Sequence, residues 1–328
     1  MPNTAPEAAP LDVALGVIED GAGRVLVGQR GAGQHQPDRL EFPGGKLEAD
    51  ESPAAGLVRE IREETALEVA HAIPCLRLEH DYGDRRVRLH VFRVPDWSGE
   101  VRECEGCALR WREAAALEPA DFPAANGPIL RLLQLPDFLL VTPDPAASDG
   151  IAAVVDRVAA RLRHGDVGLL QVRAPGLARD DYLRFARDLV AVAQSLDTEV
   201  LLNAPLDWLD ELPPAGVHLP ERRWRALSRR PAVAGRISVS AHDVTGLREA
   251  GGLAPDLDVV GPVRPTRTHP GATPLGWDGL ARLTAASPVP VYALGGLDAG
   301  SLAPARAAGA CGIAAIRGLL GEPSGARE

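Results

Sequence analysis

The sequence predicts two successive domains, an α+β domain with a mixed sheet between helices and an α/β domain of the (β/α)8 barrel type. The chain has 328 residues, of which 45% are hydrophobic, and it is longer than one typical domain. Its first part contains alternating apolar segments, whereas later short apolar segments alternate with Ala- and Arg-rich ones. We expect the first domain at 1–133, a linker at 134–137 and the barrel at 138–328.

Alternating apolar residues predict the strands of the first domain. Residues 11–19 and 24–29 flank Asp20-Gly21, a dipeptide that favours a tight turn, so we expect the two segments to form a hairpin. Strands are also expected at 73–79 and 86–94.

The second domain is predicted from eight short apolar segments with helical segments between them. Eight such units in one domain fit a closed (β/α)8 barrel, whereas the alternative, an open doubly wound sheet, usually has fewer strands. The expected strands are 138–141, 168–172, 199–203, 216–219, 236–240, 257–261, 289–294 and 312–316.

Composition limits the partners of the chain. Its formal net charge of −10 argues against a broad surface for nucleic-acid polymers but allows a local cationic pocket for one nucleotide. No apolar run is long enough to span a bilayer, and residues 1–10 lack the features of a signal peptide, so we expect a cytoplasmic protein that does not bind membranes. Cys104 and Cys107 form a C-x-x-C pair without nearby further ligands, which favours a structural interpretation over zinc.

The segment 53–65 predicts an amphipathic helix that carries a cluster of carboxylates. Glu60, Glu63 and Glu64 stand at i, i+3 and i+4, so they project from one face and repel each other unless a cation neutralises them. Carboxylate oxygens are hard ligands, which favours Mg²⁺ or Mn²⁺ over zinc. The alternative, a solvated acidic helix face, does not account for the glycine-rich entry Phe42-Pro43-Gly44-Gly45.

These residues resemble the Nudix box, G-x5-E-x7-R-E-U-x-E-E-x-G-U, where U is a bulky apolar residue. Ala66 stands where the family has its second glycine, and alanine fits that position poorly if the backbone needs a positive φ. The residues that match the pattern are Gly45, Glu51, Arg59, Glu60, Ile61, Glu63, Glu64 and Leu67.

Residues 11–133 further resemble the MutT type of this family, the 8-oxo-dGTP diphosphatases, on the stretches QRGAGQHQPDRLEFPGGK and ADFPAANGPIL. The resemblance implies that Asn126 hydrogen-bonds the oxidised purine, because an amide offers both a donor and an acceptor. It places Arg30 at the phosphates, His35 and Phe42 near the nucleoside, and Glu41 and Gly44 among the substrate-binding residues.

The reaction that this resemblance implies converts a nucleoside triphosphate and water into a monophosphate and pyrophosphate. Arg59 would hold Glu60 in place, and Lys46, the one lysine of the chain, would lie near the phosphates or the base, although chance could also have placed it there. Glu105 would be a further ligand or the general base, and its alternative is an ordinary loop carboxylate. The implied metal ligands are the Gly45 carbonyl, Glu60, Glu63, Glu64 and Glu105.

Residues 138–320 resemble thiamin phosphate synthase and its relative TenI on the motifs GVHL, SVSAH, GPV followed by PT and HPG, ALGGL and IRG. Where the synthases have a basic residue and acidic metal ligands, this chain has Gln171-Val172-Arg173 and Asn203-Ala204. We therefore expect a degenerate or repurposed barrel, either a TenI-like isomerase or a domain that binds a ligand, such as a phosphorylated thiamin precursor, without catalysis.

Glycines after the last two barrel strands expose backbone amides, which in such barrels often bind phosphate, although they could simply form tight turns. His242 and His269 are candidate acid–base groups. The other candidate ligand-binding residues of the barrel are Thr266, Thr268, Gly295, Gly296, Arg317 and Gly318.

Three functions remain for the first domain. The leading one is Mg²⁺-dependent removal of oxidised purine triphosphates from the nucleotide pool. The second keeps the chemistry but acts on a thiamin-pathway or other pyrophosphate. The third is a nucleotide sensor without catalysis, against which the intact Glu60, Glu63 and Glu64 argue.

Overall fold

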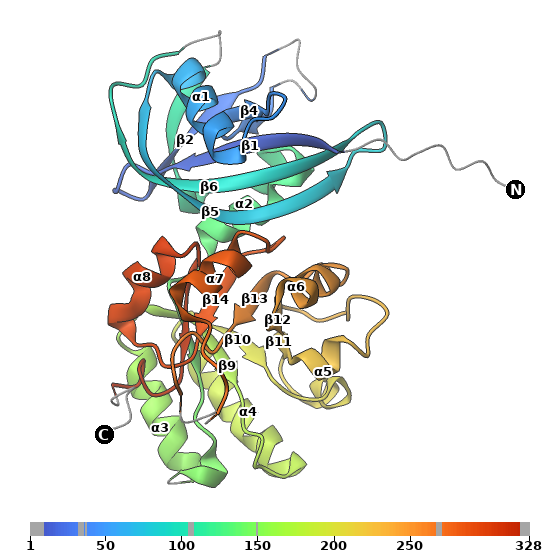
Figure 1. Ribbon diagram of the computed structural model, residues 1–328. Coiled ribbons are helices and arrows are strands. Elements are labelled where there is room, and N and C mark those ends of the chain that lie inside the picture. Colours follow the sequence, from blue (N-terminus) through green and yellow to red (C-terminus); the bar gives the residue numbers. More distant parts are fainter. Residues whose placement is uncertain are drawn as a thin grey trace, which may run out of the picture. The chain divides into compact units, whose positions relative to one another are not determined.

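A computed structural model describes residues 10–31, 36, 38–103, 108–148, 150–266 and 271–321. The chain divides into two compact units, residues 1–134 and 135–328. The first is an α+β unit and the second a closed parallel barrel, as the sequence predicts (Figure 1). Within the described part of the chain, no helix is long and apolar enough to cross a membrane.

The N-terminal unit contains a mixed four-stranded sheet and a three-stranded antiparallel sheet. Its strands are β1 (Leu11–Ile18), β2 (Arg24–Gln29), β3 (Leu40–Glu41), β4 (Gly44–Lys46), β5 (Glu68–Asp81), β6 (Arg86–Ser98) and β7 (Ala108–Glu113). The orders are β4-β1-β6-β5 and β3-β2-β7. β1 pairs parallel with β6 and antiparallel with β4, and β5 and β6 form a long curved ribbon (Figure 1).

The expected hairpin between β1 and β2 is wrong beyond its turn. Asp20 N donates to Arg24 O at 3.1 Å, and one bridge joins Glu19 to Val25. After this turn the strands separate into different sheets. β1 satisfies its backbone by pairing with β4 and β6, and β2 does so with β3 and β7, so neither needs the other.

The expected amphipathic helix is α1 (Pro53–Thr65). Ser52 caps it, since its side chain accepts from Ala55 N at 3.2 Å, and Pro53 at the first position needs no partner for an N–H. Leu57 and Ile61 are fully buried in the core between the helix and the sheet, and each such burial contributes about 1.5–3 kcal/mol. The carboxylate-bearing face therefore cannot rotate away from β4.

Short helices complete the unit. They are η1 (Ala114–Ala116), η2 (Pro119–Asp121), η3 (Ala124–Asn126) and α2 (Gly127–Gln134).

Eight parallel strands close the barrel of the C-terminal unit in the order β10-β11-β12-β13-β14-β15-β8-β9. They are β8 (Phe138–Val141), β9 (Val167–Val172), β10 (Glu199–Leu202), β11 (Gly216–Leu219), β12 (Ile237–Ala241), β13 (Leu257–Val260), β14 (Val291–Leu294) and β15 (Gly312–Ala315). Each overlaps one expected segment, with ends that differ by no more than two residues, because fully buried parallel strands have short continuous apolar sequences.

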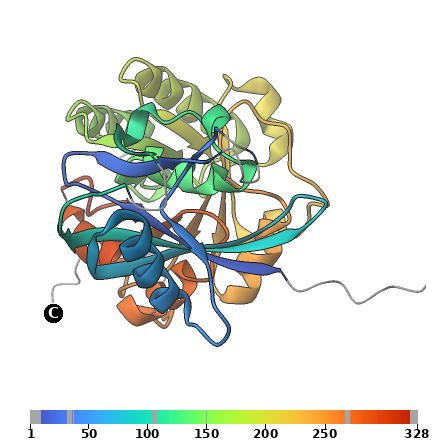
Figure 2. The ribbon, with the colours of Figure 1, turned by 90° about the horizontal axis from the view of Figure 1, so that it is seen from above.

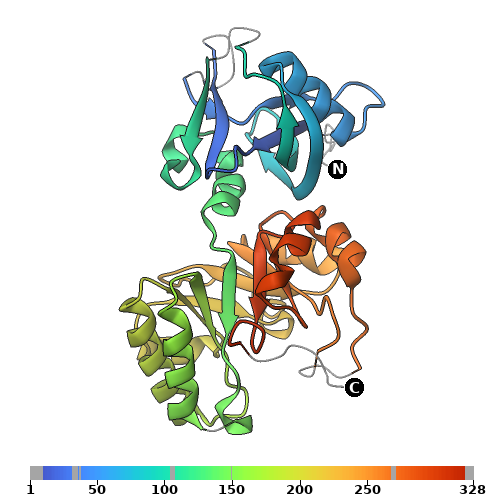
Figure 3. The same cartoon turned by 90° about the vertical axis from the view of Figure 1, so that its left-hand side faces the viewer.

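The helices of this unit lie outside its strands, and α3 and α4 pack side by side (Figures 2 and 3). The α-helices are α3 (Ile151–Leu162), α4 (Arg179–Gln194), α5 (Glu221–Trp224), α6 (Val244–Gly251), α7 (Gly276–Thr284) and α8 (Leu302–Ala307). The 3-10 helices are η4 (Pro145–Ala147), η5 (Leu206–Glu211) and η6 (Ala299–Ser301).

Candidate active site

The glycine-rich strand β4 lies directly against the carboxylate face of α1. A side chain at Gly45 would place its Cβ 2.4 Å from the carboxylate carbon of Glu60, so only glycine lets this carboxylate rest on the backbone. Gly44 has φ +138°, and a Cβ there would meet Ala14 O at 2.1 Å. Both positions thus require glycine because other atoms lie so close to the backbone there, and not because of a turn alone.

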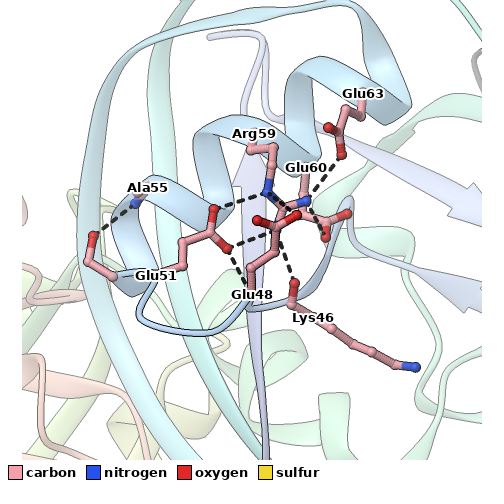
Figure 4. Close-up of polar contacts among 8 residues, drawn as sticks. Lys46, Glu48, Glu51, Ala55, Arg59, Glu60 and Glu63 are labelled. Carbon is pink, nitrogen blue, oxygen red and sulfur yellow. Dashed lines mark hydrogen bonds and ion pairs between the residues drawn. The ribbon is translucent and has the colours of Figure 1, made fainter.

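Arg59 organises the carboxylates of α1 (Figure 4). Its Nε and Nη2 donate to the two carboxylate oxygens of Glu51 at 3.0 and 2.8 Å, and its Nη1 donates to Glu60 at 2.9 Å and to Glu63 at 3.1 Å. Nη2 also donates to the Lys46 carbonyl at 3.1 Å. The guanidinium side chain therefore ties the helix to the loop before it and to β4.

These contacts shift the pKa values of Glu51 and Arg59. Hydrogen bonds from Arg59 lower the pKa of Glu51 to about 2, and the carboxylates in turn raise the pKa of Arg59, with Glu51 as the largest cause. Arg59 and Glu51 therefore remain an ion pair throughout the physiological pH range.

Glu64 contacts the backbone of β4. It accepts from Gly44 N at 2.9 Å and lines a cavity of about 700 Å³. Gly44, Gly45 and Lys46 line the same cavity, and Figure 4 shows the Lys46 side chain directed away from Arg59. Glu64 and Lys46 thus place a carboxylate and an ammonium group beside the glycine backbone of this cavity.

The same cavity brings together expected residues that lie far apart in the chain. Asn126, which is 5% exposed, lines it from η3, and Arg30 and Glu41 line it as an ion pair with Nε and Oε2 2.7 Å apart. Phe42 does not line it: this ring is buried and stacks on Phe122 with centroids 5.3 Å apart. His35 and Glu105 lie outside the described residues.

Several lining residues were missed at the sequence level. Leu11, Val13 and Leu15 of β1 form an apolar wall with two side chains of β6, and their alternation with Asp12 and Ala14 was the available signal. Tyr82 and Arg85 line the cavity from the turn between β5 and β6, where no pattern distinguishes them from ordinary turn residues.

The barrel has a separate cavity of about 490 Å³ at the carboxyl ends of its strands. Six of the expected barrel residues line it, whereas Thr268 and His269 lie outside the described residues. The six are His242, Thr266, Gly295, Gly296, Arg317 and Gly318.

Two histidines face this cavity with different partners. His242 Nδ1 lies 3.1 Å from Gly261 O, which favours a proton on Nδ1, and its Nε2 lies 3.7 Å from a Glu221 carboxylate oxygen. His218 is buried, and its ring nitrogens contact Ser238 Oγ at 2.7 Å and Ser240 Oγ at 2.9 Å. Burial lowers the pKa of His218 to about 3, so this imidazole is neutral.

Comparison with known proteins matches residues 14–132 to the NUDIX domain family and residues 138–319 to the thiamine monophosphate synthase family. The N-terminal unit is 35% identical over 124 residues to an 8-oxo-dGTP diphosphatase of Escherichia coli (strain K12), and the match covers 38% of this chain and 96% of the relative. The chain belongs to both families.

Two further relatives extend the comparison. The Nudix unit is 37% identical over 118 residues to a CTP pyrophosphohydrolase of Escherichia coli (strain K12), which covers 34% of this chain and 87% of the relative. The barrel is 33% identical over 181 residues to a thiamine-phosphate synthase of Corynebacterium jeikeium (strain K411), which covers 51% of this chain and 81% of the relative. The N-terminal unit is thus a member of the Nudix pyrophosphohydrolase family.

Nudix hydrolases generally use divalent metal ions, so the fit of this donor set matters. Among the described residues, no three His, Cys, Asp or Glu side chains are gathered closely enough to hold a metal ion. Arg59 holds Glu60 and Glu63, whereas Glu64 turns to Gly44 N. All three carboxylates nevertheless stand at i, i+3 and i+4 on α1, so the hard oxygen ligands that divalent ions prefer rise from one helix face.

The departure of Ala66 from the Nudix box has a structural consequence. Ala66 ends α1 in the left-handed conformation, with φ 59° and ψ 17°, and its N–H donates to Arg62 O at 3.0 Å. Alanine therefore holds, at the cost of local strain, a left-handed backbone that a glycine would adopt without penalty.

Proposed function

We propose that the Nudix unit hydrolyses 8-oxo-dGTP to 8-oxo-dGMP and pyrophosphate with Mg²⁺ or Mn²⁺, and so removes an oxidised nucleotide from the pool. The observation that carries this proposal is the single cavity that joins Gly44, Gly45, Lys46 and Glu64 to the buried amide of Asn126. The glycines, Lys46 and Glu64 of such a cavity suit phosphates and a cation, and the amide of Asn126 suits a purine.

At the phosphate end, residues act through charge and position. Glu60, Glu63 and Glu64 would hold the cation with the Gly45 carbonyl, and Glu105 is proposed as a further ligand or base. The bound cation would neutralise phosphate charge and lower the pKa of the attacking water. Arg59 keeps Glu60 against β4, and Lys46 offers its ammonium group to phosphate oxygens.

The reaction adds water to a phosphorus within the triphosphate. A new P–O bond forms, the P–O bond to pyrophosphate breaks, and the water gives up its protons to the surrounding carboxylates and solvent. Holding the triphosphate against a rigid glycine edge favours this step, because the attacking and leaving oxygens must lie in line.

At the base end, shape and hydrogen bonding select the substrate. The apolar wall of Leu11, Val13 and Leu15 can contact the faces of a purine, and Asn126 can donate to and accept from its edge.

Arg30 is proposed to reach the phosphates, and its pair with Glu41 fixes its orientation. Tyr82 and Arg85 add a ring and a positive charge at the rim.

Hydrolysis of a nucleotide panel tests the substrate. Purified full-length protein is given 8-oxo-dGTP, dGTP, CTP and thiamin pyrophosphate at equal concentration with Mg²⁺, and products are separated by chromatography. We expect 8-oxo-dGMP and pyrophosphate, with a kcat/KM for 8-oxo-dGTP at least tenfold above that for dGTP. Preference for CTP or thiamin pyrophosphate would replace the proposed substrate, and tight binding without any product would favour the sensor.

For the barrel we propose that its 490 Å³ cavity binds a phosphorylated small molecule, such as a thiamin precursor. Gly295 and Gly296 have φ +101° and +67° and direct the chain past the end of β14, and Arg317 and Gly318 follow β15 into the same cavity. Exposed backbone amides beside a guanidinium group suit a phosphate. Calorimetric titration with inorganic phosphate tests this, and loss of binding in Arg317→Gln is expected.

A further inference from the structure

A second group of positive charge lies at the barrel cavity, opposite its glycine end in the strand order. Arg173 lines the cavity, and Arg223 reaches its wall through Asn203. Arg173 follows β9, and Arg223 lies in α5 immediately after β11, whereas the glycines follow β14. Asn203 also lines the cavity, and Arg223 Nη1 donates to its Oδ1 at 3.0 Å. Both arginines are half-buried, so they do not simply point into solvent.

Neither arginine has a carboxylate partner among the residues that the structure describes. By contrast, Arg225 forms a close ion pair with Glu221, and Arg236 forms one with Glu199. Burial lowers the pKa of Arg223, and the opposing effects of Tyr182 and Asp207 do not offset it. A half-buried cation that has no carboxylate partner is stabilised when an anion binds.

The family to which the barrel belongs implies a divalent cation at this end of the site, but the donor set does not fit one. The position expected for an acidic ligand is Ala204, which is buried and has no donor. Glu221 is the one carboxylate among the described lining residues, and it is engaged by Arg225 at 2.7 Å and faces His242. Two guanidinium groups would in addition repel a cation.

We propose that Arg173 and Arg223 form an anion subsite that binds a phosphate, pyrophosphate or carboxylate group of the barrel ligand directly, without a divalent cation. The ligand class is then an organic anion with two negatively charged ends, one at Arg317 and the glycines and the other at this arginine pair. Guanidinium groups suit this task because each can donate two parallel hydrogen bonds to such a group. The inference rests on the proposed ligand-binding role of the cavity.

The positive charges of Arg173 and Arg223 act on a neighbouring side chain, His218. Besides burial, the charges of Arg223 and Arg173 both lower the pKa of His218 on β11, which places both guanidinium groups within electrostatic range of this one imidazole. A neutral His218, fixed by Ser238 and Ser240, gives the subsite a wall that adds no positive charge of its own.

Calorimetric titration of the full-length protein with inorganic pyrophosphate in EDTA tests the subsite. We expect binding in EDTA, no gain in affinity for free pyrophosphate on adding Mg²⁺, and at least tenfold weaker binding in Arg173→Gln and Arg223→Gln. Arg223→Lys keeps the charge and should lose less. The matched control is Arg222→Gln, because Arg222 is the adjacent, exposed residue, whereas Arg223 is half-buried and donates to Asn203 in the cavity wall.

Two results of this titration would overturn the metal-free subsite. Binding that requires Mg²⁺, or binding in EDTA that Arg223→Gln leaves unchanged while far-ultraviolet circular dichroism shows a folded protein, would overturn the metal-free subsite. If Arg317→Gln still abolishes phosphate binding in that case, the ligand-binding role of the cavity survives. If neither phosphate nor pyrophosphate binds under any condition, both proposals fail.

Discussion

Arg59 holds the carboxylate of Glu51 through two parallel hydrogen bonds, from Nε at 3.0 Å and from Nη2 at 2.8 Å. Glu51 also accepts from Glu48 N at 3.0 Å, so the pair fixes the loop that leads from β4 into α1. The remaining donors of Arg59 reach Glu60, Glu63 and the Lys46 carbonyl. One guanidinium group thus links the glycine edge of the cavity to the proposed metal ligands.

Replacement of Arg59 by lysine tests this positioning role. An ammonium group cannot make the two parallel bonds to Glu51 and also reach Glu60, so we expect kcat for nucleotide hydrolysis to fall at least tenfold. The control is Arg62→Lys on the same helix, whose bidentate partner Glu68 is exposed and distant from the cavity. Equal activity of the two variants would contradict the role of Arg59.

Replacement of Asn126 by alanine tests base selection. Asn126 is buried at the cavity wall, and loss of its amide leaves the oxidised base without this donor and acceptor. We expect the ratio of kcat/KM for 8-oxo-dGTP over dGTP to fall about tenfold. Asn203→Ala, the same change in the barrel unit, should leave the ratio as it is. An unchanged ratio in Asn126→Ala would mean that another group reads the base.

Replacement of Ala66 by glycine tests the strained helix end. Glycine adopts φ 59° without the penalty of a Cβ, but it also gains entropy in the unfolded chain, so we expect a net increase of about 0.5–1 kcal/mol in the free energy of unfolding. In Ala55→Gly, within the regular part of α1, the free energy should fall instead. Scanning calorimetry measures both changes, and a loss of stability in Ala66→Gly would refute the strain.

We expect Asp258 to make the stability of the barrel unit depend on pH. This residue is fully buried, Ser287 Oγ donates to its Oδ2 at 2.9 Å, and its Oδ1 has no hydrogen-bond partner. Burial raises the pKa of Asp258 to about 8, from 3.8. Between these values the folded state keeps a proton that the unfolded state releases, so stability falls as the pH rises from about 4 to 8.

Asp258→Asn removes this titration while keeping the shape of the side chain. The melting temperature of the variant should therefore decline less than that of the wild type between pH 5 and pH 8. Asp188→Asn, on the exposed face of α4, is the control and should follow the wild type. Parallel curves for Asp258→Asn and the wild type would contradict the proposed titration.

The sequence predicts elements well where one pattern decides the structure. The spacing of Glu60, Glu63 and Glu64 fixes them on one face of α1, and the eight apolar runs correspond to eight barrel strands. Pairing partners depend on the rest of the sheet, and for this reason the expected β1–β2 hairpin is wrong.

The residue patterns alone did not predict the contacts between distant segments. The adjacent arginines 222 and 223 look alike in the sequence, yet α5 exposes Arg222 and turns Arg223 to Asn203. Tyr82 and Arg85 line the cavity only because the turn between β5 and β6 lies beside it. Likewise, the left-handed backbone of Ala66 follows from the path of the chain into β5, not from its own preference.

The central claim is that the carboxylates of α1 serve a cation during hydrolysis of 8-oxo-dGTP. Pyrophosphate release from 8-oxo-dGTP should be measured with and without Mg²⁺ for the wild type, for Glu60→Gln and for the control Glu68→Gln. We predict release by the wild type and Glu68→Gln only with Mg²⁺, and a loss of at least a hundredfold in Glu60→Gln. Release that persists in EDTA, or full activity of Glu60→Gln, would contradict the account.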